Sequence, residues 1–228
     1  MKRRSESVRA RNEREQCKFR GDRIREIVES FRKSLPHPHD FHPSTADVCR
    51  IQDVRTIISN GTDEEFEACE EDIRSLIPEL SATMLEERRQ LFLTLLPQDS
   101  PSVEHLSLAT TMFDCMGCRK FGLRIEEALS HQCAYHANYT ARSVRYVHED
   151  ELGGFPWGPG TQFRYSKNLP ALAREIVLEC GEDPDYITTK EMNRKHHRFA
   201  CFHLNGTPTW VTVLNWFEAV SFGACKLE

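Results

Sequence analysis

The cysteine and histidine spacing between residues 113 and 133 constrains this chain more than any other feature of its sequence. Cys115 and Cys118 are separated by two residues, and twelve further residues separate Cys118 from the pair His131 and Cys133. Three thiols and one imidazole are the ligands that tetrahedral Zn²⁺ prefers. A helical run over 123–130 places His131 at its end. We therefore expect one Zn²⁺ to hold a short turn against a helix, because metal binding supplies folding free energy in small zinc modules.

The fourth ligand of this site has two candidates, Cys133 and His136. With His136 the spacing is that of two-cysteine, two-histidine fingers that read DNA. The apolar positions do not follow that pattern, since Gly122 stands where an apolar residue is expected. Thiolate is also the softer ligand. We favour Cys133 and keep His136 as the alternative; a reduced, packed Cys-x2-Cys pair and a redox pair are the competing interpretations.

Composition indicates one or two domains with a real core. The chain has 228 residues, of which 39% are hydrophobic and 29% charged, as in ordinary globular proteins. No apolar run approaches the roughly 20 residues of a membrane helix, and the N-terminus lacks the apolar segment of a signal peptide. We expect an intracellular protein, cytoplasmic or nuclear, without a membrane partner. Its nine cysteines are then expected to be reduced.

Charge is concentrated at the N-terminus. Residues 1–35 contain twelve Lys or Arg and six Asp or Glu, a net charge of +6, so the remaining residues carry −11 of the overall −5. A basic arm of this kind can bind nucleic acid. Its acidic residues interleave with the basic ones, however, which is typical of a solvated helix. We do not favour nucleic acid as the partner, and we name no residue that contacts it.

The first half of the chain is predicted to be helical. Apolar residues recur at helical spacing over 24–35, with a frayed extension upstream, and again over 44–60, over 62–78 and over 83–96. Prolines at 36, 78 and 97 are expected to end three of these helices. The predicted organisation is an α+β fold in three parts: a basic helical arm at 1–35, a helical domain at 36–97 and a zinc-binding α+β domain at 103–228.

The last part of that domain resembles a second knuckle that has lost its ligands. Residues 199–204 repeat the phase of residues 113–118, but Leu204 stands where the second thiol belongs. Asn205-Gly206 predicts a hairpin turn between two strands, and a short helix follows. We expect residues 196–225 to fold around aromatic side chains rather than a metal. Cys201 and His203 are the candidates for a weak second site.

A loop rich in glycine and proline lies at 153–160 and contains Trp157. Exposed aromatics on such loops often bind partner proteins. Trp157 can equally fold back and shield the metal. The sequence leaves both interpretations open.

The segment from about Phe41 to Phe222 resembles a group of uncharacterised basidiomycete fungal proteins of the F-box type. The resemblance rests on several short segments: Leu108–Cys118, His131-x-Cys133, Cys180–Asp185, Arg198–Cys201 and Trp216-x2-Ala219-Val220. It implies a zinc-binding C-terminal region and a role as the substrate-recognition part of an adaptor. Relatives carry a second thiol and a histidine where this chain has Leu204 and Phe222, and no F-box is evident in residues 1–40.

No catalytic constellation accompanies the predicted zinc site. A catalytic zinc needs an open position for water and a general base close by, whereas four protein ligands leave no such position. Glu126 and Glu127 are expected to be solvent-facing helix residues. We therefore name no catalytic residue and expect a zinc-stabilised protein-interaction module, with a zinc-finger-like nucleic-acid-binding protein as the alternative.

Overall fold

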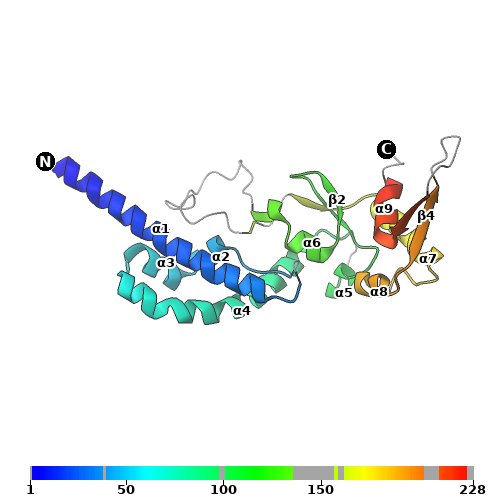
Figure 1. Ribbon diagram of the computed structural model, residues 1–228. Coiled ribbons are helices and arrows are strands. Elements are labelled where there is room, and N and C mark those ends of the chain that lie inside the picture. The colour runs from blue at the N-terminus through cyan, green and yellow to red at the C-terminus, as the bar shows by residue number, and fades with distance from the viewer. Residues whose placement is uncertain are drawn as a thin grey trace. The chain divides into compact units, whose positions relative to one another are not determined.

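The structure is a computed structural model that describes residues 2–37, 40–97, 101–135, 157–158, 162–202 and 211–224; side chains are described except at 2–10, 13, 201, 202, 211 and 222–224. The chain divides into two compact units, each with its own hydrophobic core. The N-terminal half is helical, and short strands and helices follow (Figure 1). The expected α+β class, with a Cys/His cluster after the helical half, is confirmed.

The first unit is built from helices α1 Lys2–Ser34, α2 Thr45–Cys49, α3 Gln52–Asn60 and most of α4 Asp63–Leu93. Helix α1 packs on α2 and α3, and it buries Ile24, Ile27 and Val28 against Phe66 and Ile77 of α4. The apolar spacing over 24–35 predicted this buried face.

Helix α1 spans nearly the whole basic arm that was predicted to be helical at 1–35. We expected a frayed arm before residue 24, but the structure forms one helix from Lys2 to Ser34. Two side chains upstream of the apolar stripe anchor it. Cys17 is buried, and the buried guanidinium of Arg20 donates to the carbonyl oxygen of Ile58 at 2.9 Å and to a carboxylate oxygen of Asp63 at 2.8 Å. Arg20 thereby satisfies a carbonyl at the end of α3.

The prediction that Pro78 ends a helix is wrong. A single helix, α4, includes Pro78 and extends to Leu93, where we expected two helices. An interior proline costs about 3 kcal/mol because it removes a backbone hydrogen bond and crowds the preceding turn. Ile77 and Leu80, on either side of Pro78, pack into the same core. Burial of these neighbours offsets the local cost.

The predicted helix starts are confirmed by their caps. Ser44 and Asp47 form a reciprocal capping box at α2, and Thr62 and Glu65 exchange the same two hydrogen bonds at α4. We expected one helix from Ser44 to residue 60, but the structure has two. The helical segment breaks at Arg50 and continues as α3.

A buried ion pair lies beside α2. The side chains of Arg88 and Asp47 are 3% and 5% exposed, with 3.5 Å between Arg88 Nη2 and Asp47 Oδ2. The guanidinium carbon lies 4.1 Å from the ring centroid of Phe41 and 4.4 Å from that of Trp157. Asp47 also accepts a hydrogen bond from the backbone N–H of Trp157 at 3.1 Å. Trp157 is therefore buried, which excludes its interpretation as an exposed recognition residue.

The second unit contains short strands and helices: α5 Val103–Leu106, β1 Phe113–Cys115, β2 Lys120–Leu123, β3 Phe163–Tyr165, α7 Leu169–Glu179, α8 Thr189–Arg194, β4 Arg198–Phe202, β5 Val211–Asn215 and α9 Trp216–Ala224. Three antiparallel strands form a sheet in the order β2-β1-β3, and β4 pairs antiparallel with β5. The core packs Val177 of α7, Met192 of α8 and Trp216 of α9 together. A reciprocal capping box of Thr188 and Glu191 starts α8.

The C-terminal segment has the predicted order of two strands and a helix. Phe199 of β4 and Trp216 of α9 contact the second core, and Trp216 Nε1 donates to Asn193 Oδ1 at 2.9 Å. The Asn205-Gly206 turn, His203 and the Cys201 side chain lie outside the part of the chain that the structure describes. The expectation that residues 196–225 fold around aromatic side chains rather than a metal stays a prediction, with the weak site at Cys201 and His203 as its alternative.

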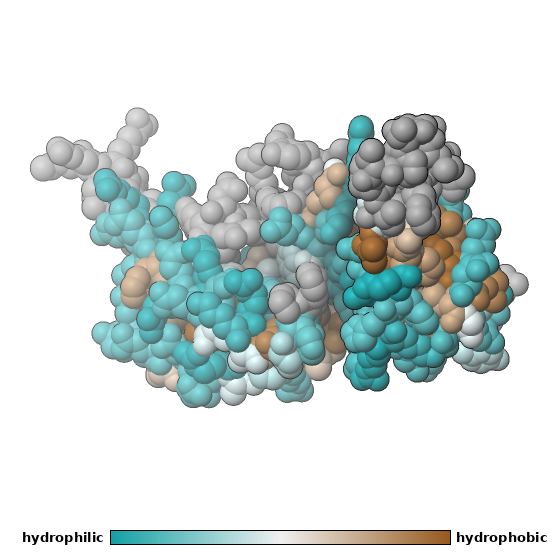
Figure 2. All heavy atoms as spheres, turned by 45° about the vertical axis from the view of Figure 1, so that its right-hand side comes forward, coloured by the Kyte–Doolittle hydropathy of each residue, from teal (hydrophilic) through white to brown (hydrophobic). Residues whose placement is uncertain are grey.

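Among the described helices, none has the length and apolar character that crossing a membrane requires. The described surface on the face drawn in Figure 2 is mostly hydrophilic, with smaller hydrophobic areas between.

Candidate metal centre

A hairpin carries the first two cysteines. Strand β1 ends with Cys115 and pairs with β2, with Phe113 opposite Leu123 and Cys115 opposite Lys120. The turn between them contains Cys118 and Arg119, whose φ is 60°. The turn therefore brings Cys118 back toward Cys115, as Cys-x2-Cys spacing requires of two ligands to one ion.

Aromatic packing holds this hairpin in place. The ring of Phe113 lies 4.8 Å from that of Phe92 and 6.4 Å from that of Tyr165, and Phe92 also contacts Phe163 at 5.3 Å. Edge-to-face pairs at these distances add about 0.5–1.5 kcal/mol each beyond burial. The backbone N–H of Met116 donates to the carbonyl oxygen of Gln162. The aromatic residue two positions before Cys115 thus anchors the strand that presents the thiol.

Helix α6 Ile125–Leu129 and the 3₁₀ turn η1 Gln132–Tyr135 carry the chain to the other two ligands. Helix α6 is shorter than the predicted run of 123–130, because residues 120–123 form β2. His131 lies between the two elements, and its carbonyl oxygen accepts from the backbone N–H of Ala134 at 2.9 Å. The tight turn places Cys133 on the ligand cluster two residues after His131.

The structure brings Cys115, Cys118, His131 and Cys133 together. One ligand atom from each residue lies within 4.8 Å of all the others. Zinc–sulfur bonds of about 2.3 Å in a tetrahedron place two sulfur atoms about 3.8 Å apart. Four ligand atoms in this arrangement can therefore close on one metal ion with a small inward movement.

Burial differs among the four ligands. Cys115 is fully buried, His131 and Cys133 are half-buried, and Cys118 is exposed. The cluster can bind a metal ion, with Cys115 held by the core and Cys118 accessible from solvent. His136 lies outside the described residues, so the preference for Cys133 over His136 stays a prediction.

Both glutamates lie on α6, but only Glu126 faces solvent as expected, because the side chain of Glu127 is 18% exposed. Glu127 accepts hydrogen bonds from the backbone N–H and guanidinium of Arg124 at 3.0–3.2 Å. Burial alone would raise the pKa of Glu127, but these hydrogen bonds and the Arg124 charge hold the pKa below its ordinary value. A carboxylate stabilised as the anion and occupied by arginine is a poor general base.

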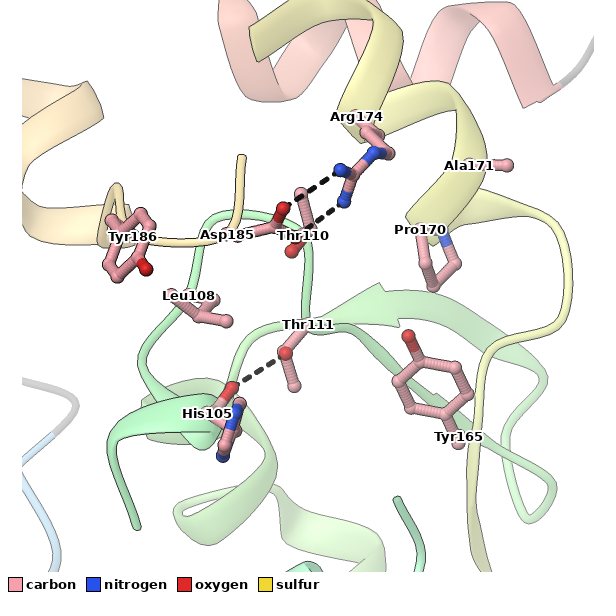
Figure 3. Close-up of a pocket in the computed structure, with 10 residues that line it drawn as sticks. All are labelled: His105, Leu108, Thr110, Thr111, Tyr165, Pro170, Ala171, Arg174, Asp185 and Tyr186. Atoms are coloured by element: carbon pink, nitrogen blue, oxygen red, sulfur yellow. Dashed lines mark hydrogen bonds and ion pairs between the residues drawn. The ribbon is translucent and has the colours of Figure 1, made fainter. Parts of the chain in front are cut away.

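The sequence interpretation missed a pocket in the second unit. Figure 3 shows residues from several separate segments around it, among them Leu108, Thr111, Tyr165, Pro170 and Arg174. No motif spacing connects these residues, because the pocket forms only when the segments meet in the fold. The one local signal is Pro170 in the first turn of α7, a position that proline favours at helix starts.

Comparisons with protein-family models, with curated proteins and with solved structures find no match to this chain.

Proposed function

We propose that this chain is a zinc-stabilised protein-interaction module. The observation that supports the proposal is the cluster of Cys115, Cys118, His131 and Cys133, with its four ligand atoms within 4.8 Å of one another. Three soft thiolates and one imidazole match zinc better than magnesium or calcium, which prefer oxygen ligands. Zinc is also the ion that this ligand number and geometry suit in intracellular structural sites.

A structural role for the ion follows from the number of ligands. Four protein ligands complete a tetrahedron and leave no position for an activated water. Glu127, which lies on the helix between the ligand pairs, is engaged by Arg124. Zinc here serves to fold the segment and present its surface rather than to catalyse a reaction.

Exposed apolar side chains next to the ligands support binding to a protein. Met116 in the hairpin turn is 47% exposed, and Phe121 on β2 is 53% exposed. Methionine and aromatic residues are enriched in protein–protein interfaces, where burial repays their contact with water. Within this class of function, the resemblance to fungal F-box-type proteins implies that the partner is a substrate of an adaptor.

We expect replacement of Met116 and Phe121 by serine to remove the partner without removing the metal. Full-length wild-type protein and the double variant serve as baits, and quantitative mass spectrometry compares the proteins that each one retains. The amount of a partner that the double variant retains should fall at least about tenfold. Truncating central interface residues commonly costs more than 1 kcal/mol of binding free energy each. Leu178→Ser, at another exposed apolar residue, is the matched control. Identical retained proteins for both variants and wild type would refute the interaction surface.

Nucleic-acid binding through the basic arm is expected to be weak. Four arginines of α1, namely Arg11, Arg23, Arg25 and Arg32, pair with acidic residues of the same helix. These pairs lower the charge available for phosphates. Fluorescence anisotropy should show no submicromolar, salt-sensitive binding to duplex DNA or RNA. Tight binding that disappears on deletion of residues 1–20 would favour the nucleic-acid alternative instead.

A further inference from the structure

A second candidate site lies in the second unit, outside the metal centre. It is a pocket of about 520 Å³ whose walls come from the start of α7, the end of β3, the segment 105–111 and the turn at 185–186 (Figure 3). Pockets that bind ligands commonly have volumes of about 300–1,000 Å³. The pocket is therefore large enough for a few residues of a peptide or for a small molecule of similar size.

Backbone hydrogen bonds tie the walls of this pocket together. The N–H of Ala109 donates to the carbonyl oxygen of Ile187 at 3.0 Å, and the N–H of Thr189 donates to that of Ser107 at 2.9 Å. On the other side, the N–H of Ser166 donates to the carbonyl oxygen of Met112 at 2.9 Å. A pocket formed before binding loses less conformational entropy when a ligand enters.

The side chain of Tyr165 lines the pocket and carries a hydroxyl group. In Figure 3 it points toward the space between Thr111 and Pro170. The ring packs edge-to-face on Phe113, with 6.4 Å between the ring centroids, and this contact restricts the direction of the hydroxyl. Burial raises the pKa of Tyr165, so the group stays protonated near neutral pH and can donate to a carbonyl oxygen.

Charge in the pocket is balanced. Arg174 donates from both terminal nitrogens to the two carboxylate oxygens of Asp185, at 2.6 and 2.9 Å. The pairing raises the pKa of Arg174 and lowers that of Asp185, so both remain charged near neutral pH. A phosphate or carboxylate group approaching Arg174 would also meet the Asp185 carboxylate. The pair therefore favours an uncharged ligand, to which Arg174 still offers its remaining N–H donors.

Polar and apolar side chains share the lining of the pocket, and its apolar part includes two tyrosines, a leucine and a proline. Tyr186 is 79% exposed, and Figure 3 places Tyr186 and Leu108 on the side of the pocket opposite Tyr165 and Pro170. Tyrosine supplies a large contact area at a small entropy cost and is enriched at interface hot spots. A mixed lining, in which aromatic and proline side chains lie beside tyrosine hydroxyls and a guanidinium, suits the apolar side chains and backbone carbonyls of an extended peptide.

We propose that this pocket binds an uncharged, extended peptide segment of the partner protein, with Tyr165 and Arg174 donating to its backbone carbonyls and Tyr186 packing on its apolar side chains. The proposal rests on the proposed protein-interaction function and assigns it a recognition site separate from the exposed residues of the hairpin. It predicts that the segment contains no required acidic or phosphorylated residue.

A phage-displayed library of random peptides, selected on immobilised full-length protein, tests the proposal. Peptides that are enriched are synthesised, and their dissociation constants are measured by fluorescence polarisation. We expect uncharged peptides whose affinity falls about tenfold with Tyr186→Ser and about fivefold with Tyr165→Phe, the cost of a packed aromatic and of one hydrogen bond. Leu178→Ser is the matched control and should leave the affinity unchanged. Each variant is first checked by circular dichroism and thermal unfolding.

Salt separates the expected ligand from an anionic one. Binding of an uncharged peptide should change little between about 0.05 and 0.5 M salt, whereas binding of an acidic peptide should weaken because exposed charges are screened. Enrichment of acidic peptides overturns the ligand class, and an empty selection overturns the site. Enriched peptides that ignore both tyrosine variants also overturn the site, but they leave the proposed protein-interaction function intact.

Discussion

Replacing Cys115 and Cys118 together by alanine should abolish metal binding and unfold the segment that the ligands hold. Zinc contributes about 10–16 kcal/mol of apparent binding free energy to small zinc modules near neutral pH, and that binding energy is folding energy. Two of the four ligands are lost in this variant, and Cys115 is the fully buried one. The remaining His131 and Cys133 cannot close a tetrahedron. We expect less than about a tenth of the wild-type zinc content.

Elemental mass spectrometry gives the zinc content, and limited proteolysis gives the folding of residues 113–135. The matched control is the pair Cys69→Ala and Cys180→Ala, two described cysteines outside the cluster, which should keep the full zinc content. A chelator added to the wild type should produce the same proteolytic fragments as the double variant. Retention of zinc in the variant, or resistance of its segment to protease, would contradict the assignment of the ligands.

The second large effect is expected at Arg88. Arg88→Met keeps an aliphatic side chain between Phe41 and Trp157 but leaves the Asp47 carboxylate buried without its cation. Breaking a buried pair in this way typically costs about 3–5 kcal/mol of unfolding free energy. The double variant Arg88→Met, Asp47→Asn should recover part of that loss, because it removes the uncompensated charge. Denaturant unfolding of the three proteins measures both effects.

The control for burial is the ion pair of Arg174 and Asp185. Its nitrogen–oxygen distance of 2.6 Å is shorter than the 3.5 Å between Arg88 and Asp47. Its side chains, however, are 50% and 62% exposed, so water replaces the lost interaction and Arg174→Met should change stability little. An Arg88→Met protein as stable as Arg174→Met would show that the buried charge is compensated in another way.

Local sequence patterns predicted the features that depend on neighbours in the chain. The start of α2 after Ser44 and the apolar face of α1 both depend on residues three or four apart. The Cys/His cluster could also be predicted from the sequence, because its four ligands lie within one stretch of 19 residues. Soft ligands at this spacing have few other uses.

Features that depend on the tertiary fold were missed. Pro78 is a helix breaker by local propensity, and only burial of Ile77 and Leu80 in one core allows α4 to continue. Arg88 and Asp47 are 41 residues apart, and nothing near Arg88 in the sequence marks it as buried. The pocket was missed for the same reason, because Tyr165 and Tyr186 belong to segments that meet only in the fold. Propensity and spacing do not encode such long-range contacts.

X-ray absorption spectroscopy at the zinc edge of freshly purified full-length protein tests the central claim most directly. The predicted result is one zinc per chain with three sulfur ligands at about 2.3 Å and one nitrogen ligand at about 2.0 Å, supplied by Cys115, Cys118, Cys133 and His131. Two sulfur and two nitrogen ligands would replace Cys133 by another ligand such as His136. An oxygen ligand from water would indicate an open, catalytic type of site, and protein without zinc would contradict the account altogether.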